Sequence, residues 1–207
     1  MCGSASVTCW PRTPSKRKKR RLRQQIRALP ARSVLLVQDE TELLLLPPLR
    51  AGWARRGAPA PVPIGGQNAR RTVFGSLHLR SGRALFLSQN RKRAENFQTF
   101  LQLIHWHYRG WSVALLLDAN SCHTAQSSQA LAQALGIQLL WLPKRSPHLN
   151  PLEHLWRDGK AVVCANHQDA CLDHQGACFI DYLQSLSATQ RLRKAGVLSK
   201  DFWLREV

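Results

Sequence analysis

Acidic residues are scarce in this sequence. Its 207 residues include 12 Asp and Glu against 30 Lys and Arg, a formal net charge of +18 at pH 7. Residues 1–32 hold ten Lys and Arg and no acid, and residues 43–117 hold eleven Lys and Arg against one acid, Glu95. So basic a surface attracts polyanions, because each neutralised phosphate releases condensed counterions. The composition therefore favours nucleic acid as the partner.

Long apolar runs are also missing. Leu43–Leu46 is followed by Pro47, and Val113–Leu117 is equally short, so neither run can cross a bilayer. A signal peptide requires an apolar segment after its basic N-terminal residues, and this sequence has no such segment. No stretch combines basic residues with the apolar helix face that binds membrane surfaces. We therefore expect no membrane partner and a cytoplasmic, nucleoid-associated location.

Nothing in the sequence indicates secretion, so its six cysteines are expected to be reduced thiols. Cys and His recur at alternating steps of three and four at Cys164, His167, Cys171, His174 and Cys178. Zinc ligands occur at such short spacings, but one face of a helix produces the same alternation. The helix-face interpretation is preferred, and metal analysis after chelation distinguishes the two.

Composition divides the chain into three parts. Residues 1–32 are predicted to be a poorly ordered basic arm, because Pro11 and Pro14 interrupt it and the run KRKKRRLR follows. Ordered structure is expected from Ser33. A folded domain is predicted over residues 33–175, and a helical C-terminal extension packed on that domain over residues 176–207.

Short apolar runs and helical patterns alternate after Ser33. We expect strands at Val34–Val37, Val113–Leu117 and Ile137–Leu142, a hairpin of Thr72–Leu79 and Arg83–Leu87 around Ser81-Gly82, and helices over Ala94–Tyr108, Ser127–Leu135, from about Pro151, and near Phe179–Leu186. Residues 47–69 are rich in Pro and Gly and are expected to form a loop. This order predicts an α/β fold with a mixed sheet.

Two apolar strands are each followed by an aspartate, in Leu-Leu-Val-Gln-Asp39 and in Leu-Leu-Leu-Asp118. Open α/β sheets place their sites at the carboxyl ends of strands. A carboxylate beside a buried strand is costly unless it is compensated, and hard divalent cations compensate it. One such Asp is better explained as a turn residue, but the repetition favours a metal site. Glu40 would point to the opposite face of the strand and is left out of the set.

Glu153 is the third candidate ligand, in Asn150-Pro151-Leu152-Glu153. The same residues suit a helix start, with Asn as N-cap, Pro in the first position and Glu closing a capping box. The pattern leaves capping and metal binding open, and Glu153→Gln separates them because glutamine still caps. Three carboxylates holding two Mg²⁺ ions roughly 4 Å apart would act on phosphodiesters by in-line displacement.

Three strings then carry a family resemblance: QDET followed by PPLRAGWARRG, LLLDANSCH, and LPKRSPHLNPLEHLW. They resemble the DDE catalytic domain of Tc/mariner-like bacterial insertion-sequence transposases. Asp118 and Glu153 are separated by 34 residues, the spacing expected in that superfamily for its second and third acids. The resemblance spans roughly residues 33–203, and the block LP-x-x-SP-x-LNP-x-E-x-x-W is its most specific part.

The resemblance implies an RNase H-like fold, with residues 33–175 as the DDE catalytic domain. It also implies Asp39, Asp118 and Glu153 as catalytic metal ligands, and two Mg²⁺ or Mn²⁺ ions as cofactor. The implied activity is metal-dependent cleavage of DNA at the ends of a mobile element, followed by strand transfer to target DNA. The block around Asn150 disfavours a stand-alone RNase H-type nuclease.

The implied partner is double-stranded DNA, both element ends and target, bound by a homodimer. Full transposases of this group read their terminal repeats with helix-turn-helix modules, and the residues before Ser33 are too few for these. We therefore expect either a separate N-terminal helix-turn-helix partner or, as the alternative function, a catalytically silent DNA-binding remnant.

Basic and histidine side chains are the candidate DNA contacts. They are Lys18, Lys19, Arg20, Arg21, Arg70, Arg71, His123, Lys144 and Arg145. His123, five residues after Asp118, is expected to orient the site or contact phosphate, with a hydrogen-bonded loop histidine as the alternative. Trp53 and Trp156 are expected to be core or loop anchors rather than base-stacking platforms, because large aromatic side chains usually bury.

Overall fold

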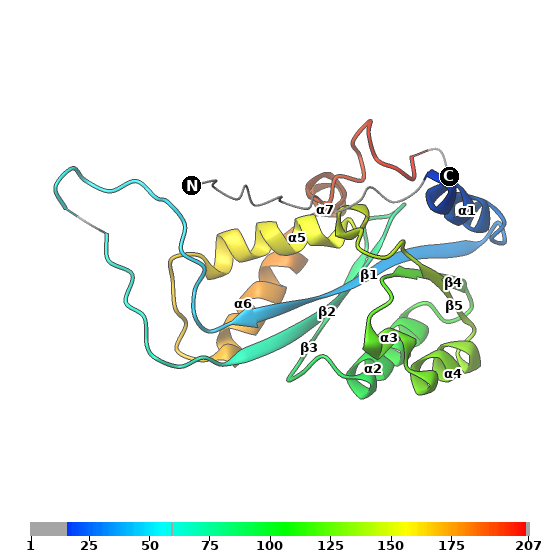
Figure 1. The fold of residues 1–207 in the computed structure, drawn as a ribbon, viewed down its shortest axis with the longest axis horizontal. Coiled ribbons are helices and arrows are strands. Elements are labelled where there is room, and N and C mark those ends of the chain that lie inside the picture. Colours follow the sequence, from blue (N-terminus) through cyan, green and yellow to red (C-terminus); the bar gives the residue numbers. More distant parts are fainter. Residues whose placement is uncertain (1–15, 59, 206–207) are drawn as a thin grey trace, which may run out of the picture.

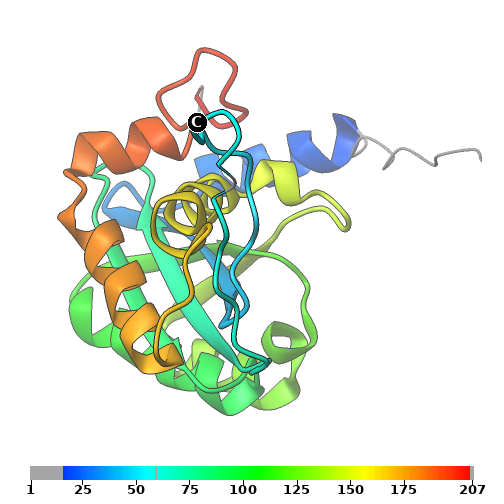
Figure 2. The same ribbon diagram turned by 90° about the vertical axis from the view of Figure 1, so that its left-hand side faces the viewer.

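A five-stranded mixed sheet lies at the centre of the protein, with helices on both faces (Figures 1 and 2). The computed structural model describes residues 16–58 and 60–205. In chain order the elements are α1 (Lys16–Arg27), β1 (Ser33–Leu44), β2 (Arg70–His78), β3 (Ala84–Gln89), α2 (Ala94–His107), β4 (Ser112–Leu117), α3 (Ser121–Thr124), α4 (Gln126–Ala134), β5 (Ile137–Trp141), η1 (Pro147–Leu149), α5 (Leu152–Gly159), η2 (Lys160–Cys164), α6 (Leu172–Ser185) and α7 (Ala188–Lys194). The predicted α/β class with a mixed sheet is confirmed.

The sheet has the strand order β3-β2-β1-β4-β5. β1, β2 and β3 pair antiparallel, whereas β4 runs parallel to both β1 and β5. The predicted hairpin is confirmed as β2–β3, and Gly82 in its turn has a φ of +69°, a conformation that glycine adopts without a Cβ clash. The sheet therefore has an antiparallel half and a parallel half, and β1 joins them.

β1 is longer than the predicted strand Val34–Val37. It continues to Leu44, because residues 38–44 keep pairing with β2 after the pairing with β4 has ended. Strand residues that are covered on both faces of the sheet are continuously apolar, and in β1 this holds only for the part that pairs with β4. In the second part, exposed Glu42 and Leu44 alternate with buried Thr41 and Leu43. Asp39 consequently lies inside a strand rather than at its end.

Each face of the sheet has its own apolar core. On one face, α5, α6 and α7 cover side chains that include Val37, Val73 and Leu116. On the other face, α2 and α4 cover Leu36 and Leu115. The predicted amphipathic helix over Ala94–Tyr108 is confirmed as α2, which buries Phe97, Phe100, Leu101 and Ile104. The alternation of β1 thus sends neighbouring residues to opposite cores.

The prediction of an unstructured arm up to residue 32 was wrong for α1. Residues 1–15 lie outside the described part, but Lys16–Arg27 is helical and buries Leu22 and Ile26 in the core beneath α5. Two apolar side chains four residues apart share one helix face, and burying them stabilises the helix despite its charge. Arg23 Nε also donates a 2.8 Å hydrogen bond to the Trp203 carbonyl.

The loop between β1 and β2 extends away from the sheet, as Figure 1 shows. The Asn166 side chain pairs with both backbone groups of Arg50, at 2.8 and 2.9 Å. The Gln168 side chain accepts a hydrogen bond from the Gly65 amide. The expectation that Trp53 anchors this loop was wrong, because its side chain is fully exposed. The loop is held at its two stems instead.

Within residues 16–58 and 60–205, no helix has the length and apolarity that a membrane crossing needs. The predicted boundary between residues 175 and 176 falls inside α6, which packs against the sheet along its length. The division into arm, domain and extension stays a prediction.

Candidate active site

Asp39 lies inside β1, and Asp118 directly follows the neighbouring strand β4. The pairing of the parallel strands β1 and β4 ends with Val37 and Leu116, and the same register extended by two residues matches Asp39 with Asp118. Neighbouring strands are about 4.8 Å apart. The register of β1 and β4 therefore directs both aspartates, far apart in the sequence, to the region where β4 ends and β1 continues.

Glu153 lies in the first turn of α5, above this point. Asn150 Nδ2 donates to the Gln38 carbonyl at 3.0 Å, which fixes the start of α5 to β1. Asn150 Oδ1 accepts from Leu152 N at 3.1 Å, confirming its capping role. A capping box would need the Asn150 amide for Glu153, but that amide donates to Pro147 O at 2.7 Å. The Glu153 carboxylate is therefore left for another role.

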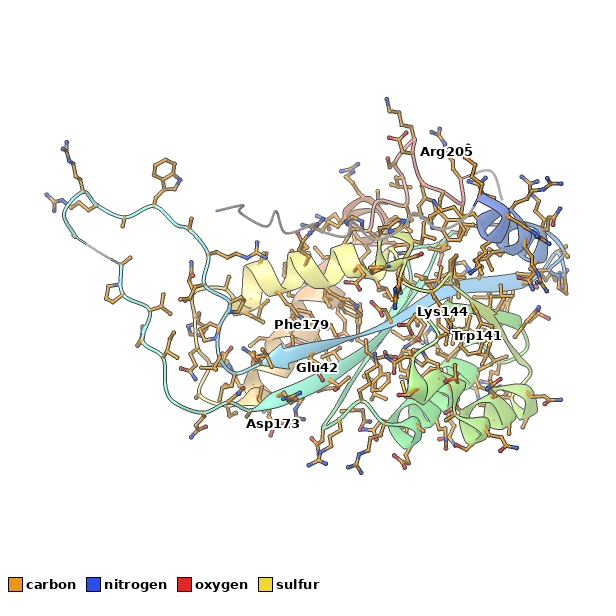
Figure 3. The ribbon with its side chains drawn as sticks, viewed as in Figure 1. Glu42, Trp141, Lys144, Asp173, Phe179 and Arg205 are labelled. Carbon is orange, nitrogen blue, oxygen red and sulfur yellow. The ribbon has the colours of Figure 1, made fainter. Side chains whose placement is uncertain are left out.

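Trp156 connects α5 directly to the candidate site. Its Nε1 donates a 3.0 Å hydrogen bond to Asp39 Oδ2, and its ring is buried between Phe86 and Phe179. The expectation that Trp156 is a core anchor is confirmed. Gly75, which pairs with Asp39 across β1 and β2, makes room for this ring, since a Cβ there would lie 2.3 Å from it. Figure 3 shows Phe179 on the α6 side of the sheet.

The electrostatics of Asp39 are unusual for a carboxylate. Burial, followed by the negative charges of Glu40 and Glu153, raises the pKa of Asp39 to about 8. The hydrogen bond from Trp156 and the charge of Lys92 act in the opposite direction. Without a cation, Asp39 therefore carries a proton at neutral pH. The negative charge of Glu153 on α5 therefore acts electrostatically on Asp39.

Asp118 faces a buried histidine. His123 Nδ1 lies 2.9 Å from Asp118 Oδ1, and His123 Nε2 lies 2.5 Å from Glu40 Oε1. The His123 side chain is completely buried, so a phosphate contact does not fit its position, whereas the orienting role does. Burial opposes the charged ring, but hydrogen bonds to Asp118, Cys122 and Glu40 raise the pKa of His123 to about 12. The same contact with His123 lowers the pKa of Asp118.

The three predicted ligands are not gathered around one point. In the part of the chain that the structure describes, the one set of three metal-ligand side chains with all ligand atoms within 4.8 Å of one another is Glu40, Cys122 and His123. Lys92 Nζ lies 2.6 Å from Glu40 and already neutralises it, so this set is an ion-pair network rather than a cation site. A site for two ions roughly 4 Å apart spreads its ligands more widely than a single ion does.

The alternating Cys and His residues do not share one helix face, so that interpretation was wrong in part. Cys164 ends η2, His167 lies in the loop, and Cys171 precedes the first residue of α6. Cys171 Sγ accepts from the His174 amide, and His174 Nδ1 contacts Asp169 Oδ1 at 2.9 Å. Within the described residues, these side chains include no set of three with the geometry of a metal site.

The candidate DNA contacts differ in how they are placed. Lys18, Arg20 and Arg21 are exposed and Lys19 is half-buried on α1, and Lys144 and Arg145 are exposed in the loop between β5 and η1. Figure 3 shows Lys144 away from Glu42, which lies near the end of β1. Arg70 pairs with Glu42 at 3.8 Å, and the less exposed Arg71 pairs with Asp173. The contacts on α1 and in the β5–η1 loop are therefore better placed than those on β2.

The sequence analysis missed three contributors to the site. Glu40 was set aside, and its opposite orientation is confirmed, but its carboxylate contacts His123, which in turn contacts Asp118. Lys92 was not considered. Lys160 was also missed: burial lowers its pKa, and the charges of Cys164, Glu153, Glu42 and Asp39 only partly oppose this shift. Lys160 follows Glu153 by seven residues, and that helical spacing was the available signal.

Comparisons with known proteins identify the family to which this chain belongs. A family model described as DDE superfamily endonuclease matches residues 34–174. A Shigella sonnei protein described as "Insertion element IS630 uncharacterized 39 kDa protein" is 28% identical over 133 residues. That match covers 63% of this chain and 39% of the Shigella protein, so the chain spans well under half of this relative.

Solved structures show the same fold. The Mos1 transposase paired-end complex with left transposon end matches with a TM-score of 0.68 and 15% identity, over 99% of this chain and 67% of that one. The catalytic domain of Mos1 mariner transposase matches with a TM-score of 0.61 and 13% identity, over 94% of each chain. The mariner Mos1 paired-end complex with Mg matches with a TM-score of 0.68 and 15% identity, over 98% of this chain and 65% of that one. The Mos1 mariner paired-end complex with Mn matches with a TM-score of 0.65 and 14% identity, over 99% of this chain and 67% of that one. The predicted RNase H-like fold is confirmed.

Proposed function

The chain belongs to the DDE superfamily endonucleases, and from that premise we propose that it is a transposase catalytic domain. It cleaves phosphodiester bonds of insertion-sequence DNA with a divalent metal and transfers the freed strand to target DNA. The observation that carries this proposal is the parallel register of β1 and β4 up to Val37 and Leu116, two residues before Asp39 and Asp118. Glu153, whose charge reaches Asp39 from α5, completes the set.

The proposed metal ligands suit a hard cation. All three are carboxylates, the ligand type that Mg²⁺ and Mn²⁺ bind. Burial and the negative charges of Glu40 and Glu153 raise the pKa of Asp39, and a divalent cation would counter these effects. Asp39, Asp118 and Glu153 would hold two such ions, which activate the attacking water or 3′-hydroxyl and stabilise the leaving oxygen.

The remaining side chains of the site fix the ligands in place. The indole of Trp156 orients Asp39, and the amide of Asn150 holds the start of α5 against β1. Asp118 is half-exposed, so it faces both the buried His123 and the solvent from which DNA approaches. Lys160 is close enough to feel the charges of Glu153 and Asp39. Preorganised ligands of this kind avoid reorganisation during the reaction.

Double-stranded DNA is the proposed partner. Trp203 connects two exposed basic segments, because its carbonyl accepts from Arg23 on α1 and its Nε1 donates to the Leu149 carbonyl in η1. Lys18–Arg21 on α1 and Lys144-Arg145 before η1 therefore flank the same region, and their charges favour phosphate binding. Arg70, Arg71 and His123 are weaker candidates because of their ion pairs or burial.

The finer assembly is also part of the proposal. We propose a homodimer on DNA, end recognition by a separate helix-turn-helix partner, and action in the cytoplasm at the nucleoid.

The test is metal-dependent cleavage and strand transfer with a DNA substrate. We expect activity with Mg²⁺ or Mn²⁺, loss of activity in Asp118→Asn and Glu153→Gln, and wild-type activity in Asp181→Asn, an exposed position on α6. All four proteins should bind DNA in a salt-sensitive manner. Equal, metal-independent behaviour of wild type and Asp118→Asn would instead establish the alternative, a catalytically silent DNA-binding remnant.

A further inference from the structure

A chain of four charged side chains leads from the protein surface to Asp118. Lys92 Nζ lies 2.6 Å from Glu40 Oε2, and Glu40 Oε1 lies 2.5 Å from His123 Nε2. His123 Nδ1 lies 2.9 Å from Asp118 Oδ1 and 3.0 Å from the Asp118 carbonyl. We propose that Glu40 and Lys92 are positioning residues that fix the Asp118 carboxylate for metal binding by holding the His123 ring. This inference rests on the proposed function.

Burial makes this arrangement rigid. The side chains of His123 and Glu40 are 0% and 1% exposed, and that of Lys92 is 26% exposed. The His123 ring also packs against Phe97, with 4.5 Å between the ring centroids. Buried charges need close partners of opposite sign, and here the signs alternate from Lys92 to Asp118. The ring therefore has little freedom to turn.

The topology explains why Glu40 serves Asp118 rather than Asp39. Consecutive strand residues point to opposite faces, so Asp39 meets Trp156 below α5 while Glu40 meets His123 on the side of α2 and α3. One strand thus supplies a proposed ligand to one face and a support to the other. Lys92, from the loop between β3 and α2, closes the chain from outside.

Positioning accounts for these residues better than direct chemistry. Glu40 and His123 are buried and cannot reach a DNA strand. Asp118 Oδ1 is occupied by His123 Nδ1 and, at 3.2 Å, by the Asn120 amide. Both contacts use Oδ1, which leaves Oδ2 for a metal ion. Groups that orient metal-binding side chains typically change metal affinity or activity by about 10–100-fold when they are removed.

The experiment compares four variants of the full chain: Glu40→Gln, Lys92→Met, Lys92→Arg and the control Glu42→Gln. Glu42 lies two residues along β1, is half-exposed, and pairs with Arg70 at 3.8 Å. We expect Glu40→Gln and Lys92→Met to lower kcat for DNA cleavage about 10–100-fold, with an unchanged KM for DNA. They should weaken Mn²⁺ binding to DNA-free protein, measured by calorimetry. Lys92→Arg keeps a positive charge at this position and should therefore keep most of the wild-type kcat and most of the Mn²⁺ affinity.

The outcomes separate this inference from the proposed function. Full activity in Asp118→Asn overturns both. If Asp118→Asn is inactive while Glu40→Gln and Lys92→Met match Glu42→Gln in kcat and Mn²⁺ affinity, the positioning role alone is overturned. It is also overturned if Lys92→Met lowers only thermal stability. If Glu40→Gln does not fold, the comparison of Lys92→Met with Lys92→Arg, at a partly exposed position, tests the positioning role.

Discussion

Replacing Asp39 with Asn should stabilise the protein in the absence of metal. The pKa of Asp39 rises from an ordinary value of 3.8 to about 8 in the folded protein. The folded state therefore keeps a proton that the unfolded chain releases, and the stability that Asp39 contributes is lost as the pH rises between these two values. Asn cannot ionise, so Asp39→Asn lacks this loss.

The magnitude follows from the same two pKa values. The gap between 3.8 and about 8, at about 1.4 kcal/mol per pH unit, gives an upper limit of about 6 kcal/mol. The new amide N–H groups of Asn need partners in a buried site, at a cost of about 1–3 kcal/mol. We expect Asp39→Asn to be more stable than wild type by at most about 3–5 kcal/mol at pH 9, and no more stable at pH 4.

Urea unfolding in the presence of a chelator, from pH 4 to pH 9, measures this difference. Other titrating groups are common to both proteins and cancel in the comparison. Added Mn²⁺ should stabilise the wild type and leave Asp39→Asn unchanged, because binding to the folded state alone raises stability. A stability difference between the two proteins that stays constant across the pH range would refute the reasoning.

Three further predictions concern the surroundings of Asp39 and the cysteines. Gly75→Ala places a Cβ 2.3 Å from the ring of Trp156; urea unfolding should show a loss of about 1–3 kcal/mol, and unchanged stability would contradict the close packing. Trp156→Phe removes the hydrogen bond that lowers the pKa of Asp39, so the pH midpoint of Mn²⁺ binding should move upward, and a downward shift would be inconsistent with that bond. Cys178→Ser should leave the unfolding temperature unchanged and the chelator-treated protein free of zinc by metal analysis, whereas one bound zinc per chain would revive the rejected site.

Apolar patterns predicted the elements that bury a whole face or both faces. The runs at β4 and β5, the hairpin, and the spacing of α2 were all recognisable, because burial imposes a period on the sequence. The length of β1 was not, since residues 38–44 contain five polar or charged side chains in a row. α1 was missed for a related reason, as its two buried side chains are surrounded by basic residues.

The candidate ligands could be named from the sequence, but not their supports. Asp39 and Asp118 follow similar apolar runs, whereas Glu40 and His123 are 83 residues apart and meet only through the register of β1 and β4. Lys92 has no distinguishing neighbour in a region already rich in basic residues. Trp53 was placed incorrectly because its size suggested burial, while its loop offers no core to enter.

The amide side chains that grip the β1–β2 loop have a consequence for how this region can change. The side chains of Asn166 and Gln168 form hydrogen bonds with backbone groups of Arg50 and Gly65. These bonds do not depend on which side chains residues 50 and 65 carry. Substitutions, deletions or insertions between residues 50 and 65 are therefore expected to leave the pairing of β1 with β2 unchanged. Diversification of this segment is thereby uncoupled from the carboxylates of the sheet.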